Sequence, residues 1–76
     1  MSDLGKRVLA MARVAAGQPF RDWPAWSTGE MLAVALVLNR FDVLDELSWT
    51  IVEAMDRLDG ELSVAELRAI EQELQR

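Results

Sequence analysis

The most uniform hydrophobic stretch of the chain is a run of eight apolar residues at positions 31–38. Periodicity alone does not distinguish a helix from a buried strand in so short a run. Its composition and its upstream flank favour a helix, because Ala and Leu have high helix propensity and Ser27 and Glu30 have the spacing of a capping box. We therefore predict a helix over residues 28–40. A helix that is apolar on every side needs to be enclosed by the rest of the fold, so we expect Leu36 to be buried. The alternative is that the run lies partly exposed as a partner-binding surface.

The N-terminal segment has the hydrophobic spacing of an amphipathic helix over residues 3–16. Ser2 stands where a cap is needed at its start. Gly17, with Pro19 just beyond it, is typical of a helix end. The residues that recur on one face, and that we expect to point into the core, are Leu4, Val8, Met11, Ala12 and Ala15.

Two more capping boxes mark helix starts in the second half of the chain. Thr50 is followed three residues later by Glu53, and Ser63 by Glu66. Before them, we expect a bend near Asn39 and then a short helical turn. The apolar residues that the spacing directs toward the core are Phe41, Leu44, Leu47, Ile51, Ala54, Met55, Leu58, Val64, Leu67, Ile70 and Leu74.

An aromatic loop at residues 18–26 joins the first two predicted helices and carries Phe20, Trp23 and Trp26. A stiff aromatic loop can serve as a binding anchor, since Trp is enriched at interface hot spots. It can also fold back as a lid over a small core, because each ring buries a large area. We favour the lid, with Trp26 as its buried ring in the position of a hydrophobic staple.

No segment shows the alternation of a strand, so the sequence predicts an all-α protein. We expect a single domain over residues 1–76, built as a small bundle of four to five short helices around the central apolar helix. A chain of 76 residues has a small core and marginal stability. A homodimer is therefore one expected way of adding buried surface.

The composition removes several kinds of chemistry. The chain has no Cys and no His, which excludes disulfides, thiolate or imidazole zinc sites, and Cys or His catalysis. Residues 55–66 can be aligned with a calcium-binding loop, but Met55 and Arg57 occupy positions that require oxygen ligands. No nucleophile has a neighbouring base. We expect a protein that is not an enzyme and that uses no cofactor or metal.

The chain shows no secretory signal, and its apolar run is far shorter than the roughly 20 residues that span a bilayer. We therefore expect a cytoplasmic protein with no membrane partner.

Charge is distributed unevenly along the chain. Residues 1–40 carry five cations and three carboxylates, whereas residues 41–76 carry three cations and ten carboxylates, a net charge of −7. Such a half attracts basic surfaces and repels phosphate. Acidic residues that only cover the solvent-exposed faces of helices would give the same net charge. The residues that we predict to form an acidic partner-binding face are Asp42, Asp45, Glu46, Glu53 and Asp56.

The alternative function is a small regulator that binds nucleic acid. Its contacts would come from the N-terminal cations Lys6, Arg7, Arg13 and Arg21. Four cations on a chain of net charge −5 form a weak electrostatic footprint, so direct nucleic-acid binding is the less favoured interpretation.

Residues 22–40, which read DWPAWSTGEMLAVALVLNR, and residues 49–58, which read WTIVEAMDRL, carry a family resemblance. They resemble small helical proteins of proteobacterial mobile elements, a group that includes anti-CRISPR proteins directed at type I Cascade. The likeness lies in core and cap positions and extends over residues 22–58, about half of the chain, so no functional residue can be transferred. It implies a stoichiometric inhibitor that binds a Cas subunit of Cascade and blocks binding of target DNA.

Overall fold

The computed structural model describes residues 1–76 and contains five α-helices, one 3₁₀ helix and no strands. The predicted all-α class is therefore confirmed, and the predicted helix starts agree closely with the observed ones. The elements are α1 (Asp3–Ala15), η1 (Phe20–Asp22), α2 (Thr28–Val37), α3 (Phe41–Glu46), α4 (Ile51–Leu58) and α5 (Val64–Leu74).

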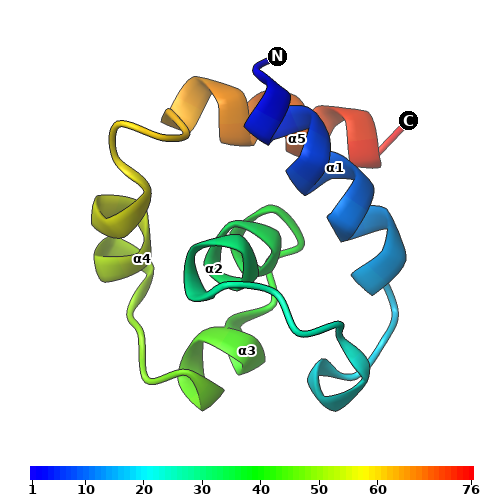
Figure 1. Cartoon of the computed structure of the whole chain (residues 1–76), viewed down its shortest axis with the longest axis vertical. Coiled ribbons are helices and arrows are strands. Elements are labelled where there is room, and N and C mark those ends of the chain that lie inside the picture. Colours follow the sequence, from blue (N-terminus) through cyan, green and yellow to red (C-terminus); the bar gives the residue numbers. More distant parts are fainter.

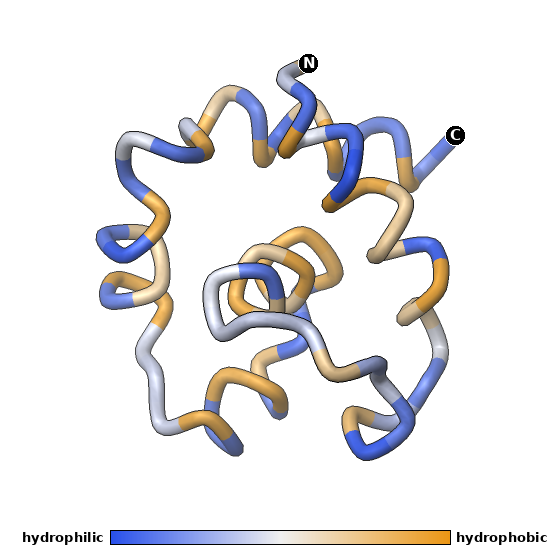
Figure 2. Tube along the Cα trace, in the orientation of Figure 1, coloured by the Kyte–Doolittle hydropathy of each residue, from blue (hydrophilic) through white to orange (hydrophobic).

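Helix α2 lies at the centre, and the other helices surround it (Figure 1). It packs against α1, α3, α4 and α5. Its hydrophobic residues form an apolar centre in the trace of the chain (Figure 2). The buried residues of the apolar run are Leu32, Ala33, Val34, Ala35 and Val37. The prediction of an enclosed central helix is confirmed for these positions.

The prediction that Leu36 is buried is wrong, because this residue is only half-buried. Its side chain faces a gap between α4 and α5. The helix also ends at Val37, earlier than the predicted residue 40. The chain turns at Asn39, whose φ of 54° is left-handed and ends the helical geometry at the expected bend.

The helix caps follow the sequence signals with one exception. Both hydrogen bonds of the capping box are present at Ser27 and Glu30, and again at Thr50 and Glu53. Ser63 accepts a hydrogen bond from the backbone of Glu66 at 3.1 Å, but the Glu66 carboxylate does not return one. It accepts a hydrogen bond from the Ser2 hydroxyl, which joins the starts of α1 and α5. The third box is therefore only half formed.

Three residues predicted to point into the core are exposed instead: Phe41 at 52%, Ile51 at 45% and Val64 at 54%. Each is the first residue of its helix. Val64 lines the space between α2, α4 and α5, and spacing alone does not show how far neighbouring helices cover the first residue of a helix. Residues further along the same helices, such as Leu44, Leu58 and Ile70, are buried as predicted.

The aromatic loop is a lid, as predicted, but Trp23 is its buried ring and Trp26 is only half-buried. Phe20 meets Trp23 edge-on with ring centroids 5.3 Å apart. The Arg40 guanidinium lies 5.6 Å from the centre of the Trp23 ring and donates a hydrogen bond to the Gln18 carbonyl at 2.8 Å. Arg40 thereby holds the lid from the far end of α2, a contact between residues 22 positions apart.

Candidate functional site

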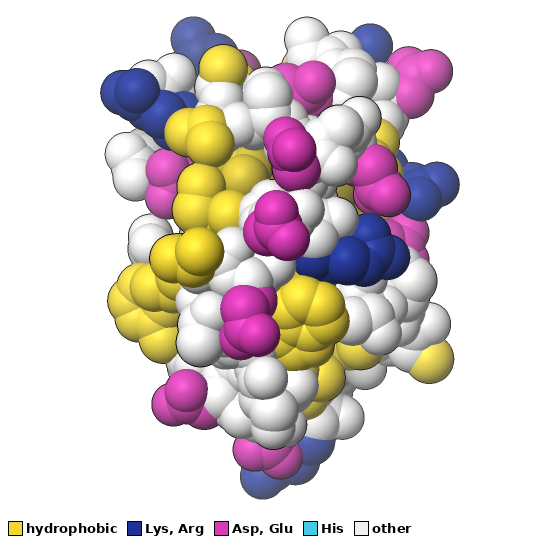
Figure 3. All heavy atoms as spheres, turned by 90° about the vertical axis from the view of Figure 1, so that its left-hand side faces the viewer, with side chains coloured by type: hydrophobic (Ala, Val, Ile, Leu, Met, Phe, Trp, Pro, Cys, Tyr) yellow, Lys and Arg dark blue, Asp and Glu magenta, His cyan; other side chains and the backbone are white.

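Exposed large hydrophobic residues are concentrated where α3, α4 and α5 begin. Phe41, Ile51, Val52 and Val64 lie there, whereas only Met1 and Val14 are comparable on the N-terminal segment. Val52 is the most exposed, at 76%. The view onto the α4 side shows a band of hydrophobic side chains with acidic side chains beside it (Figure 3). Single exposed apolar residues are ordinary, but a grouped set marks a candidate interaction surface.

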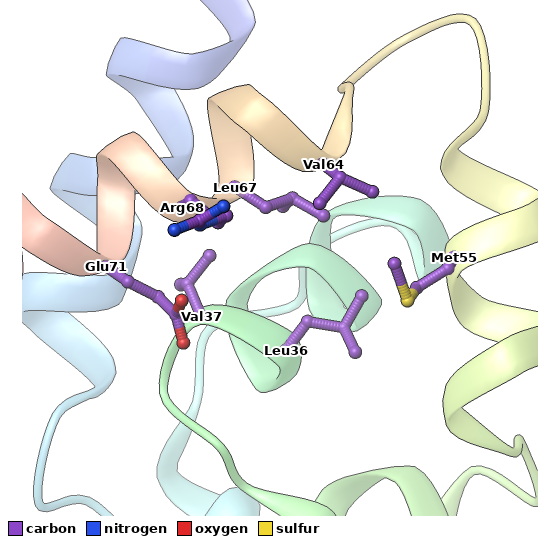
Figure 4. Close-up of a pocket in the computed structure, with 7 residues that line it drawn as sticks. All are labelled: Leu36, Val37, Met55, Val64, Leu67, Arg68 and Glu71. Carbon is purple, nitrogen blue, oxygen red and sulfur yellow. The ribbon is translucent and has the colours of Figure 1, made fainter.

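A groove opens in this region between α2, α4 and α5, with a volume of about 150 Å³. Leu36 and Met55 point toward each other across it, and Val64 and Leu67 close it from α5 (Figure 4). The groove exists because α4 and α5 both pack on α2 but make little contact with each other. We call it the α2–α4–α5 groove. Its lining residues are Leu36, Val37, Met55, Val64, Leu67, Arg68 and Glu71.

The five carboxylates of the predicted acidic face are all exposed. Two of them already have local partners. Arg40 donates two hydrogen bonds to Asp42, at 2.9 and 2.8 Å, and this contact lowers the pKa of the Asp42 carboxyl. Glu53 accepts from the Thr50 backbone at 3.0 Å, and the hydrogen bonds with Thr50 lower its pKa.

The remaining three carboxylates, Asp45, Glu46 and Asp56, have no cation within ion-pair distance. They lie on two helices, with Asp45 and Glu46 on α3 and Asp56 on α4. Glu46 and Asp42 border a shallow hollow beside η1, and Asp56 does not. The structure therefore exposes the predicted set but divides it between two neighbouring helices.

The N-terminal cations are less available than the sequence implied. Arg7 forms an ion pair with Glu30 at 2.9 Å, and Arg21 lies 4.0 Å from Asp22. The pKa of Glu30 is lowered first by the hydrogen bond from the Ser27 backbone and further by Arg7. Lys6 and Arg13 have no carboxylate within ion-pair distance. Half of the predicted basic set is thus already compensated by neighbouring carboxylates.

The calcium-loop alignment falls on the end of α4 and the start of α5. Arg57 pairs with Glu61 at 3.5 Å, Gly60 turns the chain with a φ of 87°, and Ser63 caps α5. No group of three or more side chains able to bind a metal lies together, and the buried residues include no polar side chain. None of the helices has the length and apolar character needed to cross a bilayer. The candidate sites in this structure are therefore surface features.

No protein family, curated protein or solved structure matches this chain. The candidate site consequently depends on the geometry of the chain itself. The acidic face stays a prediction from the sequence, with all of its residues exposed, and the groove was not predicted. The available signal was the apolar run itself, in which Leu36 is only partly covered by the surrounding helices and lines the groove.

Proposed function

We propose that this protein acts by binding a partner protein that presents a basic surface, and that it inhibits the partner by occupying that surface. The observation that carries the proposal is the group of unpaired carboxylates Asp45, Glu46 and Asp56 on the same helices as the exposed Phe41, Ile51 and Val52. Interfaces commonly combine an apolar centre with charged residues that steer association.

The net charge of residues 41–76 supports the same proposal. A value of −7 attracts a basic partner over a distance of about one Debye length and raises the association rate. The same field repels phosphate, which disfavours direct nucleic-acid binding. We expect the association rate with the partner to fall as salt is added.

The first partner to test is type I Cascade, because residues 22–58 resemble small mobile-element proteins that include anti-CRISPR proteins. The experiment mixes purified Cascade with this protein, follows co-elution by gel filtration, and measures binding of target duplex. We expect a stoichiometric complex that no longer binds target DNA. Separate elution together with undiminished DNA binding would exclude Cascade as the partner.

The acidic face is tested with the double variant Glu46→Lys/Asp56→Lys. Glu53 stays unchanged, because its carboxylate holds the cap of α4 and reversing it would also weaken that helix. The matched control is Asp22→Lys/Glu73→Lys, which makes the same change in net charge on η1 and α5. We expect the first variant to lose partner binding and the control to keep most of it.

A further inference from the structure

The α2–α4–α5 groove has the size and lining of an anchor site for one side chain. Five of its seven lining residues are hydrophobic, and its volume is about 150 Å³. An apolar cavity of about this volume admits a group of the size of benzene. A single Leu or Phe side chain from another molecule therefore fits it.

The rim of the groove carries one cation, Arg68, and one carboxylate, Glu71. Arg68 forms no ion pair, and it does not pair with Glu71 although the two are only three positions apart on α5. One Glu71 carboxylate oxygen accepts a long hydrogen bond of 3.4 Å from the Asn39 amide. On the opposite side, Met55 belongs to the helix that also exposes Glu53 and Asp56.

Charge distinguishes two occupants that this apolar groove could receive, a second copy of this chain and a basic partner. In a symmetric dimer, each copy would bring its own acidic half, of net charge −7, against the same half of the other copy. Like charges placed face to face oppose association. A basic partner has the complementary charge, and a helix is the element that fits an apolar groove between helices.

We propose that the α2–α4–α5 groove receives one Leu or Phe side chain from a basic amphipathic helix of the partner. This inference rests on the proposed function, in which the partner presents a basic surface, and it adds the structural element that the partner contributes. The apolar side chain enters between Leu36, Met55 and Val64. Basic residues on the partner helix face Glu71, and the position next to Arg68 carries no cation.

The test uses three synthetic peptides of about 15 residues, a length at which a helix becomes stable in water. The first carries Lys and Ala with one central Leu. The second replaces this Leu by Ala, and the third keeps the Leu but replaces every Lys by Glu. Binding to the full chain is followed by NMR of ¹³C-methyl methionine, because Met55 lines the groove while Met11 is buried in the core.

We expect the Lys–Leu peptide to shift the Met55 methyl signal and to bind about tenfold or more tightly than the Lys–Ala peptide, since the Leu side chain becomes buried. The Glu–Leu peptide should bind more weakly than the Lys–Leu peptide because the surrounding carboxylates repel it.

Two variants distinguish binding in the groove from nonspecific hydrophobic binding. Val64→Phe fills the groove, whereas Val14→Phe makes the same change at an exposed position on α1, outside the groove. Val64→Phe should remove the preference for Leu over Ala, and Val14→Phe should retain it. Both residues are more than half exposed, at 54% and 61%, so neither change disturbs the core.

Three results would overturn the inference. Equal affinity for the Lys–Leu and Lys–Ala peptides, with no Met55 shift, excludes the groove as an anchor site while leaving the acidic face in place. Failure of both Lys-rich peptides to bind contradicts the proposed function together with the inference. A Met55 signal that moves with protein concentration alone makes a second copy of this chain the occupant.

Discussion

Helices α1 and α4 flank α2 from opposite sides and cover it to different extents (Figure 1). The longer α1 has 13 residues and also packs along α5. Its buried residues extend along the whole helix and are Gly5, Val8, Met11, Ala12 and Ala15. The shorter α4 has 8 residues and buries Ala54 and Leu58.

This difference follows from helix length and has a functional consequence. At 1.5 Å per residue, α1 is about 20 Å long and α4 about 12 Å. The short helix leaves Leu36 partly uncovered and presents Ile51 and Val52 to solvent. The α1 side of α2 is therefore covered, whereas the α4 side retains exposed apolar residues beside unpaired carboxylates. The incompletely covered side is the one that we propose binds the partner.

The largest loss of stability is expected for a fully buried residue of the core. Leu32 is fully buried, so Leu32→Ala should destabilise the protein by about 2–5 kcal/mol through lost transfer energy and a residual cavity. A domain of this size has a total stability of about 5 kcal/mol. Urea denaturation followed by Trp fluorescence measures the change. A loss below about 1 kcal/mol would mean that α2 is less enclosed than the structure shows.

A smaller effect is expected at Leu36, four residues further along the same helix. Since this side chain is only half-buried at the edge of the groove, Leu36→Ala should cost roughly 1 kcal/mol. The same urea titration makes the comparison with Leu32→Ala direct. Equal losses for the two variants would show that the groove is closed in solution.

The helix caps should make stability depend on acidic pH. The pKa values of Glu30 and Glu53 are lowered from their ordinary value of 4.5, mainly by hydrogen bonds from the Ser27 and Thr50 backbones. A carboxylate with a depressed folded-state pKa contributes stability above its unfolded pKa and loses it as pH falls through the folded value. The free energy of unfolding should therefore decrease below about pH 4.5.

Neutral variants show which part of this decrease comes from the caps. Glu30→Gln and Glu53→Gln retain a side chain that can accept the cap hydrogen bond but does not titrate. Each should make the free energy of unfolding depend less on pH between about pH 5 and pH 3. A dependence on pH that is as steep in the double variant as in the wild type would assign the acid sensitivity to other carboxylates.

The smallest expected effect is at the exposed side of α4. Val52 is 76% exposed, so Val52→Ala should change stability by less than about 0.5 kcal/mol. The matched control is Val8→Ala on α1, where the side chain is fully buried and should cost about 2 kcal/mol. Thermal melts of the two variants sharpen the contrast between α1 and α4. A substantial loss at Val52 would place this residue in a core contact.

Most of the fold could be predicted because its signals are local. Capping boxes mark the starts of α2 and α4, and hydrophobic spacing identified four of the five buried residues of α1. Helical spacing defines an angle around the helix axis but not a position along a neighbouring helix. For that reason the spacing predicts that Phe41, Ile51 and Val64 point into the core, although each lies at the end of a helix and is exposed.

Contacts between distant segments could not be predicted. Ser2 and Glu66 are 64 positions apart, and their hydrogen bond replaces the return bond of a capping box. The lid depends in the same way on Arg40, which contacts Trp23 and Gln18 across the fold. The groove is a space left between three helices and has no sequence pattern of its own. The acidic residues were predictable because charged side chains on short helices are nearly always exposed.

The α3–α4 side of the molecule is the interaction surface that we propose. The most direct measurement is affinity capture from a lysate of CRISPR-bearing cells, with bound proteins quantified by mass spectrometry. Three baits are compared: the wild type, Glu46→Lys/Asp56→Lys, and the charge-matched Asp22→Lys/Glu73→Lys. We predict that at least one protein is captured by the wild type and the charge-matched control and is lost from the α3–α4 variant. Capture of the same proteins in the same amounts by all three baits would contradict the account.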